Sequence, residues 1–369
     1  MKILVTGGGG YIGVVLCERL LAAGHDVRVL DRLYWGHAPL LHLRDRIELV
    51  QEDVRAIDSS VLDGIDGVAH LAGLSNDPTA EYNPDANWQM NAEATTHLAA
   101  ACKERRISRF SFGSSASIYD GLGDGPFDES ADVQPRGAYS TSKFAAEQSL
   151  RELAGDGFHP AILRQGTVYG YSPRMRLDLV VNTFIKDALL RGTLFLHGGG
   201  WMWRPLVDVT DVAEAHMRCL EADPLTVSGE IFNVVHGNFQ IRQLAMLVSG
   251  SLSLHERAVR LEDAPLPKIN RNYRCANAKL TQALGFTPHV TVLESIERML
   301  SKLPVKDPAG LAHPRYYNID WMTLLEDVVA THAGERSIWD ATTAASVNGA
   351  TTAPAKSAEP TPSKSLRSR

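Results

Sequence analysis

Thr6-Gly7-Gly8-Gly9-Gly10-Tyr11-Ile12-Gly13 decides the fold, because it joins a short apolar run to the first amphipathic stretch of the chain. Gly7, Gly10 and Gly13 form the pattern T-G-x-x-G-x-x-G. Glycines at these positions permit a tight turn and let backbone N–H groups approach a pyrophosphate, which the following helix faces with its positive dipole end. The stretch therefore predicts a dinucleotide-binding βα unit, with Tyr11 and Ile12 also at the cofactor.

The same alternation of short apolar runs and amphipathic stretches continues through the first half of the chain. The expected strands are Lys2–Thr6, Val27–Leu30, Ile47–Gln51, Gly67–Leu71, Arg109–Gly113 and Ala161–Arg164, and the expected helices are about Tyr11–Ala23, Asp85–Arg105 and Ala138–Ala154. Strands that alternate with helices predict right-handed βαβ units. The strands are apolar on both faces, as when helices cover both sides of a parallel sheet. We therefore predict an α/β fold, a Rossmann-type doubly wound parallel sheet.

After Gly170 the alternation loosens, and we expect a smaller C-terminal substrate-binding lobe. Its expected elements are helices at Asp178–Leu190, Asp211–Glu221, Ile241–Leu252 and Val292–Leu303, with one more strand at Ile231–Val235. The predicted domains are a dinucleotide-binding domain at residues 1–170, whose sheet is completed by later segments at about 204–240, and an interleaved lobe at 171–332 that mainly binds the substrate. From about Ala333 the chain is rich in Ala, Thr, Ser and Pro, so residues 333–369 are predicted to be a disordered tail.

Composition narrows the class of protein. The chain has 369 residues and a net charge of −6, which argues against a nucleic-acid binder. Its four cysteines show no paired spacing, and no metal-binding motif occurs, so neither disulfides nor a metal site is expected. No targeting segment or membrane-length apolar run is visible, so a soluble cytoplasmic protein is expected.

The ends of the next strands point to NAD. Asp31 ends the second strand, where a carboxylate accepts hydrogen bonds from the adenosine ribose and would repel a 2′-phosphate. Arg32 complicates this reading, because an arginine there can pair with that phosphate. Asp53-Val54 and Leu71-Ala72-Gly73 follow the third and fourth strands, so we expect both to line the nucleotide site. The alternative for Asp31 is a solvated turn carboxylate.

Tyr139 and Lys143 are the candidate chemical groups, because a Y-x-x-x-K spacing places both side chains on one helical face. A tyrosine ionises near pH 10, and a fixed cation nearby lowers that pKa, so Tyr139 is expected to exchange a hydroxyl proton while hydride moves to a nicotinamide. Ser114, Ser115 and Ser117 follow the fifth strand, where a hydroxyl can orient the reacting alcohol. Some of these serines are expected only to cap a turn.

Together these residues resemble the extended short-chain dehydrogenase/reductase family, in its branch of NAD-dependent nucleotide-sugar epimerases and dehydratases. The likeness covers about residues 1–300. It rests on TGGGGYIG, Asp31, Asp53-Val54, HLAG at His70–Gly73, SSASIY at Ser114–Tyr119, Tyr139/Lys143, LRQGTVYG at Leu163–Gly170 and WRPLVDVTDVAEA at Trp203–Ala215. The resemblance implies a homodimer packed through helices near Tyr139 and a nucleotide-sugar substrate, with neither a nucleic acid nor a membrane as partner.

The resemblance also implies roles for single residues. Ser115, Tyr139 and Lys143 match the catalytic set. Residues expected at the cofactor by the same likeness are Asn91, Ser114, Tyr139, Lys143, Gly166 and Val168. Residues expected at the substrate are Ser75, Asn76, Ser115, Thr167, Asn182, Arg204 and either Arg271 or Arg274; the last two arginines read equally well as solvated surface charges. The segment Tyr171–Arg176 is expected to shape the sugar pocket with the loop at Ser75.

Departures from the family pattern narrow the reaction. Dehydratases of the family carry an Asp-Glu pair directly after the catalytic Ser or Thr, and here Ala116 and Ser117 stand there, which argues against elimination of water. The leading hypothesis is an NAD-dependent nucleotide-sugar epimerase that oxidises and reduces C4 through a transient keto-sugar. The alternatives are a nucleotide-sugar dehydrogenase, a keto-sugar reductase, or a non-catalytic NAD-binding regulator.

Overall fold

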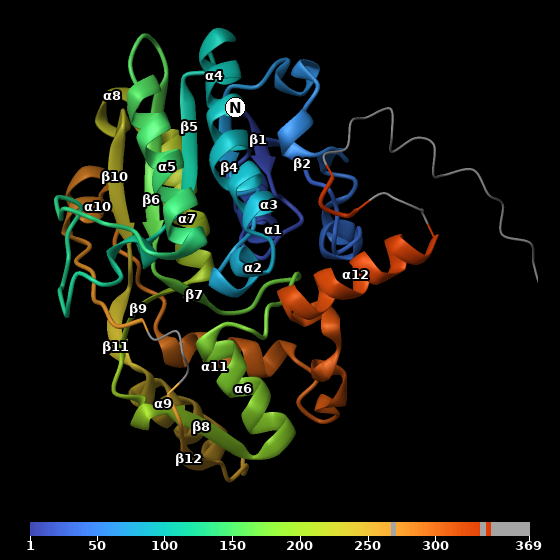
Figure 1. The fold of residues 1–369 in the computed structure, drawn as a ribbon, viewed down its shortest axis with the longest axis vertical. Coiled ribbons are helices and arrows are strands. Elements are labelled where there is room, and N and C mark those ends of the chain that lie inside the picture. The colour runs from blue at the N-terminus through green and yellow to red at the C-terminus, as the bar shows by residue number, and fades with distance from the viewer. Residues whose placement is uncertain (267–270, 333–336, 341–369) are drawn as a thin grey trace, which may run out of the picture.

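A seven-stranded parallel sheet organises the molecule, and its strand order reverses beside β1 (Figure 1). The computed structural model describes residues 1–266, 271–332 and 337–340. Across the sheet, the strands are β10 (Glu230–Val234), β6 (His159–Gln165), β5 (Arg109–Ser115), β4 (Gly67–His70), β1 (Lys2–Thr6), β2 (Asp26–Leu30) and β3 (Ile47–Val50). The chain crosses from β3 back to β4 on the other side of β1, which opens a crevice at the carboxyl ends of β1 and β4. This confirms the predicted fold class.

Side-chain alternation along β1 explains why helices cover both faces of the sheet. Ile3 and Val5 belong to one buried cluster with α1 (Gly13–Ala22) and α7 (Val209–Glu221). Leu4, between them, belongs to the opposite cluster with α4 (Ala94–Glu104) and α5 (Gly137–Leu153). Successive strand residues point to opposite faces, so a strand apolar at every position is buried on both sides.

One predicted helix is interrupted. Asp85–Arg105 was expected to be continuous, but the structure has α3 (Pro84–Trp88), a π-helical turn η4 (Gln89–Glu93) and then α4. A π turn inserts an extra residue into the helical ladder, and such turns often mark functional sites. Here the turn buries Asn91 completely.

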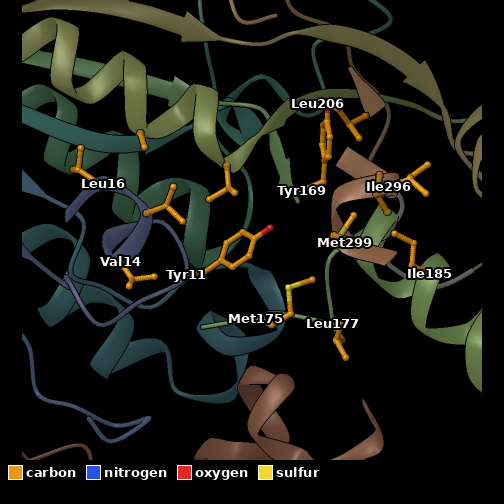
Figure 2. Close-up of a cluster of buried hydrophobic side chains, with 14 of the residues drawn as sticks. Tyr11, Val14, Leu16, Tyr169, Met175, Leu177, Ile185, Leu206, Ile296 and Met299 are labelled. Carbon is orange, nitrogen blue, oxygen red and sulfur yellow. The ribbon is translucent and has the colours of Figure 1, made fainter. Parts of the chain in front are cut away.

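The second half of the chain forms a lobe that shares its core with the sheet domain. Its strands are β7 (Thr167–Tyr169), β9 (Trp203–Asp208) and β11 (Gly237–Gln240) in one small sheet, and β8 (Thr193–His197) with β12 (Arg260–Ala264) in another. Its helices are α6 (Val180–Arg191), α9 (Ile241–Leu254) and α11 (Val292–Lys302), whereas α8 (Pro224–Val227) and α10 (Ala278–Leu284) lie beside β10 of the large sheet (Figure 1). Figure 2 shows Val14 of α1 in the same apolar cluster as Ile185 of α6 and Met299 of α11. Because these side chains form one buried cluster, the lobe is fixed against the nucleotide-binding half.

The C-terminal part of the described chain returns to the N-terminal half. Helix α12 (Asn318–His332) packs against α2 (Asp77–Tyr82) of the sheet domain, and the short turn at residues 337–340 binds Tyr34 and Arg55 of that domain. Residues 333–336 and 341–369 of the predicted disordered tail lie outside the described residues. For 337–340 the prediction is wrong, because Ile338 and Trp339 are buried. In the described part of the chain, every helix is too short or too polar to cross a membrane.

Candidate active site

The glycine loop between β1 and α1 closes tightly against the loop after β4. Gly7 has φ +71°, and a Cβ there would lie 2.7 Å from the backbone nitrogen of Ala72. A side chain at Gly13 would collide with the carbonyl of Gly7. Predicted cofactor residues that line one pocket at this crevice are Gly7, Gly10, Tyr11, Ile12, Gly13, Asp31, Arg32, Asp53, Val54, Leu71, Ala72 and Gly73. The backbone cradle therefore fits a pyrophosphate at the N-terminus of α1.

Asp31 is held at this pocket by the backbone. Its two carboxylate oxygens accept hydrogen bonds from the N–H groups of Gly9 at 2.9 Å and Leu33 at 2.7 Å. Burial raises the pKa of Asp31, because the charged form loses water. Each oxygen keeps a second lone pair, which fits the hydroxyls of an adenosine ribose.

Arg32 is hydrogen-bonded to other side chains of the protein. Its guanidinium donates to the carboxylate of Asp53 at 3.1 Å and to the hydroxyl of Tyr34 at 2.7 Å, and it stacks over the Tyr34 ring. Burial alone would raise the pKa of Asp53, but hydrogen bonds from Arg55 and the charge of Arg32 lower it. An arginine already paired with a carboxylate is a poor partner for a 2′-phosphate, so this arrangement fits NAD better than NADP.

Two arginines at this pocket were expected elsewhere. Arg174 and Arg176 line the cofactor pocket, although their segment was predicted to shape the sugar pocket. The Arg174 guanidinium lies 3.8 Å from the centre of the Trp35 ring, and its Nε and one terminal nitrogen have no partner among the described residues. Burial, with the neighbouring charge of Arg176, lowers the pKa of Arg174 to about 9. An anion bound in the pocket would satisfy this buried cation, which supports the fit of a dinucleotide pyrophosphate.

The predicted chemical residues meet at the carboxyl end of β5. Tyr139 and Lys143 lie one turn apart on α5, and the Ser115 side chain lies near Tyr139 while its hydroxyl donates to Ser117 at 3.0 Å. The Lys143 ammonium donates to the carbonyl of Gly113 at 2.9 Å. A Cβ placed on Gly73, in the pocket lining, would lie 3.8 Å from that ammonium. The ammonium is therefore adjacent to the cofactor pocket, and Tyr139 lies close enough to Arg176 of the pocket lining for that charge to lower its pKa.

The pKa of Tyr139 is shifted in the opposite direction to the one expected. Burial raises the pKa of Tyr139, a hydrogen bond from Ser115 opposes this rise, and the nearby Asp77 carboxylate adds to it. The sequence-based expectation of a lowered pKa is therefore wrong. Burial also lowers the pKa of Lys143 to about 8, although Glu147 opposes the change. Both groups are desolvated, and perturbed groups of this kind are typical of catalytic sites.

Asn91 supports this centre from the π turn. Its amide nitrogen donates to the carbonyl of Leu74 at 2.9 Å and to the side chains of Asn87 and Ser142. Its Oδ1 is buried, has no partner among the described residues and faces Gly73. An unsatisfied buried acceptor is costly, so this oxygen is placed to accept a hydrogen bond from a ligand or a water.

Of the two candidate substrate arginines, only Arg271 reaches the chemical residues. It pairs with Asp77 and donates to the hydroxyl of Ser140 and the carbonyl of Ser117. Arg274 instead holds the carbonyls of Asp124 and Gly125, at 2.9 and 3.0 Å. Arg204 donates to the carbonyl of Arg271 and so supports it.

Asn182 is engaged in internal hydrogen bonds, and its predicted contact with the substrate stays a prediction. Its side chain is fully buried, accepts from the backbone of Gly170 at 3.1 Å and donates to the carbonyl of Arg176 and the hydroxyl of Tyr11. Both amide hydrogens are used, so the residue joins α6 to the glycine loop.

Other predicted residues lie outside the lining of the cofactor pocket. Ser114 donates to the buried Glu147, and Asn76 caps α2 (Asp77–Tyr82). Thr167 and Val168 belong to β7, with Gly166 directly before it against Pro205. Ser75 does line the pocket and accepts from Arg176 at 2.8 Å. The ligand contacts proposed for these residues stay predictions.

Comparisons with known proteins agree with this geometry. A family model described as "NAD dependent epimerase/dehydratase family" matches residues 3–234. A UDP-glucose 4-epimerase of Mycolicibacterium smegmatis is 30% identical over 81% of this chain and 97% of its own length. A UDP-glucose 4-epimerase of Corynebacterium glutamicum is 28% identical over 80% of this chain and 93% of its own. The solved UDP-N-acetylglucosamine 4-epimerase of Methanobrevibacter ruminantium, in complex with UDP-N-acetylmuramic acid, has a TM-score of 0.73, 25% identity, and covers 82% of this chain and 99% of its own.

Proposed function

The chain belongs to the NAD dependent epimerase/dehydratase family, and we propose that it epimerises a nucleotide sugar at C4 through a transient keto-sugar. The observation that carries this proposal is the contact between the Ser115 and Tyr139 side chains, beside Lys143 and next to the cofactor pocket. Two hydroxyls that face one another can hold one sugar hydroxyl between them. The curated 4-epimerases, similar over most of their length, support the same reaction class.

The residues that would hold NAD form one continuous set. The glycine loop and Arg174 fit the pyrophosphate, Asp31 fits the adenosine ribose, and Asn91 and Lys143 stand at the chemical end. When bound, NAD supplies reversible hydride transfer at its nicotinamide.

Proton transfer falls to the chain's own side chains. The Ser115 hydroxyl, which donates to Ser117 in the structure, would turn to donate to the Tyr139 phenolate and stabilise it, in line with its lowering effect on the Tyr139 pKa. The phenolate then accepts the C4 hydroxyl proton, and the phenol returns it when the keto group is reduced. Lys143 adds positive charge one helical turn away while it is protonated. For epimerisation the keto-sugar must turn over in the pocket before reduction.

Dehydration is disfavoured by the chain itself. Ala116 and Ser117 follow Ser115, and neither side chain is an acid or a base. The hydroxyl of Ser117 lies 2.9 Å from the hydroxyl of Ser140. The carboxylate of Asp77 lies near Tyr139 but is paired with Arg271.

Arg271 is the residue we assign to the substrate diphosphate, because its buried Nε has no partner among the described residues, although a terminal nitrogen pairs with Asp77. Arg271→Gln is expected to raise KM for the nucleotide sugar by about tenfold or more, because a charge-assisted hydrogen bond contributes about 1.5–3 kcal/mol. NAD affinity should change little. Steady-state kinetics and titration with NAD check this, and Arg274→Gln is the matched control, since Arg274 binds the carbonyls of the 124–125 loop. Equal effects of the two substitutions on KM would contradict the assignment.

The homodimer implied by the family likeness is also part of this proposal, with α5 and its neighbour α4 as the expected contact. Light scattering after size exclusion tests it, because a monomer at working concentration would contradict it.

The reaction is tested with a panel of nucleotide sugars. Purified protein is incubated with UDP-glucose, UDP-N-acetylglucosamine and UDP-glucuronic acid, and both the sugar isomers and the reduced-cofactor absorbance are followed. The proposal expects a C4 isomer with no net absorbance change. Net reduction of NAD would indicate a dehydrogenase, and a loss of water would indicate a dehydratase.

A further inference from the structure

The wall of the cofactor pocket on the adenosine side includes residues from the far C-terminal end of the described chain. Asn318 and Met322, four residues apart on α12, line the pocket with Asp31 and Asp53. Met322 is buried. This helix therefore presents one face to the place where the β2 carboxylate fits the ribose.

Asn318, in the pocket wall, binds the buried Arg174. Its side-chain oxygen accepts from Arg174 at 2.6 Å, and its amide nitrogen donates to Ser75 at 3.1 Å. The same Arg174 stacks on Trp35 and carries two nitrogens without a partner among the described residues. The N-terminal turn of α12 thus holds the cation that fits the pyrophosphate.

The loop after β2 binds α12 directly. The Trp321 indole donates to the carbonyl of Tyr34 at 2.8 Å, and the Trp35 indole donates to the carbonyl of Arg315 at 3.1 Å. Tyr34 and Trp35 themselves line the pocket. Binding of the helix therefore fixes the loop that carries the ribose side of the site.

The turn at residues 337–340 binds both the loop after β2 and helix α12. The Tyr34 hydroxyl donates to the carbonyl of Ile338 at 2.8 Å, and Arg55 donates to the carbonyl of Trp339 at 2.7 Å. The Trp339 indole donates to Glu326 of α12 at 2.8 Å. Ile338 and Trp339 pack with Met322, Leu74 and Met90 in one buried cluster.

We propose that α12 and residues 337–340 form a C-terminal clamp that completes the adenosine side of the NAD site and retains the cofactor. Groups on both sides of this contact line the pocket, namely Met322 and Asn318 from the clamp and Tyr34 and Trp35 from the β2 loop. Release of the adenosine then requires the β2 loop and the clamp to separate. Retention suits a reaction in which the same cofactor molecule is reduced and reoxidised.

The test measures cofactor release and not turnover. Protein loaded with NADH is mixed with excess NAD⁺, and the loss of bound-NADH fluorescence gives the dissociation rate. Trp339→Ala removes the indole that binds Glu326 and most of a buried aromatic side chain, so we expect dissociation to be at least about tenfold faster. Met322→Ala, which opens the pocket wall itself, should raise the Kd for NAD⁺ by about tenfold.

Matched controls separate the clamp from general destabilisation. Leu324→Ala alters an exposed side chain of the same helix and should leave both constants unchanged. A chain that ends at Asp340 should also behave as the full chain, while a chain that ends at Ala333 should release NADH as fast as Trp339→Ala. Thermal unfolding verifies that each variant is folded.

If the folded Trp339→Ala protein kept the wild-type rate of NADH dissociation and the folded Met322→Ala protein kept the wild-type Kd for NAD⁺, the clamp proposal would be overturned. Because the readout is NAD binding, this result would leave the proposed epimerisation untouched. Conversely, a protein that epimerises no nucleotide sugar can still show clamp-dependent retention of NADH.

Discussion

Tyr139→Phe is expected to lower kcat by about 10³-fold while NAD still binds, because general acid–base catalysis contributes about 10²–10⁴-fold. The substitution removes the one phenolic oxygen that Ser115 contacts and leaves the ring in place. Since the phenol is not part of the pocket lining, the Kd for NAD⁺ should stay nearly unchanged. Turnover of the active nucleotide sugar and titration with NAD⁺ measure the two quantities.

A tyrosine elsewhere in the chain serves as the control, and shows whether the loss of turnover is specific to Tyr139. Tyr317→Phe removes a hydroxyl that donates to the carbonyl of Leu311, far in sequence from the chemical residues. It should retain wild-type turnover. If Tyr139→Phe also retained full activity, the proton-transfer role of Tyr139 would be refuted.

Lys143→Met is expected to abolish turnover and to make the ligand-free protein more stable. Burial lowers the pKa of Lys143 from 10.5 to about 8, a cost of about 3 kcal/mol at 1.36 kcal/mol for each pH unit. Methionine carries no charge to desolvate, but it leaves the carbonyl of Gly113 without its donor, which costs about 1 kcal/mol. The free energy of unfolding at pH 7 should therefore rise by about 2 kcal/mol.

The pH dependence of stability identifies the cause. With a folded pKa near 8 and an unfolded value of 10.5, Lys143 binds fewer protons in the folded protein between these pH values. The wild-type contribution to the free energy of unfolding therefore rises with pH from about 8 to about 10.5. Urea unfolding of both proteins at several pH values should show that this rise is missing in Lys143→Met. A less stable Lys143→Met protein with an unchanged pH dependence would contradict the buried-charge explanation.

The sheet could be predicted from the sequence because each strand is marked by a short stretch of neighbouring residues. The central strands, such as β1, are short runs of mainly apolar residues, because they are buried on both faces. The glycine loop and Asp31 follow from the same local reasoning, since each lies directly after one of those strands.

Other features depend on contacts between distant segments, which spacing does not reveal. The π turn at Asn91 has no local signal that separates it from a continuous helix. Arg174 and Asn318 meet across the fold. The pair Ile338-Trp339 is a short apolar island in a polar tail, and its burial depends on Tyr34 and Arg55. The raised pKa of Tyr139 likewise reflects burial, which the Y-x-x-x-K spacing does not include.

The most direct test of the central claim follows the hydrogen at C4. The active nucleotide sugar is supplied with deuterium on that carbon, and the product is analysed by mass spectrometry and NMR. Transient oxidation with a retained cofactor predicts the C4 epimer with deuterium still on C4 and no net reduction of NAD. Exchange of that deuterium with solvent, or accumulation of NADH with a keto product, would contradict it.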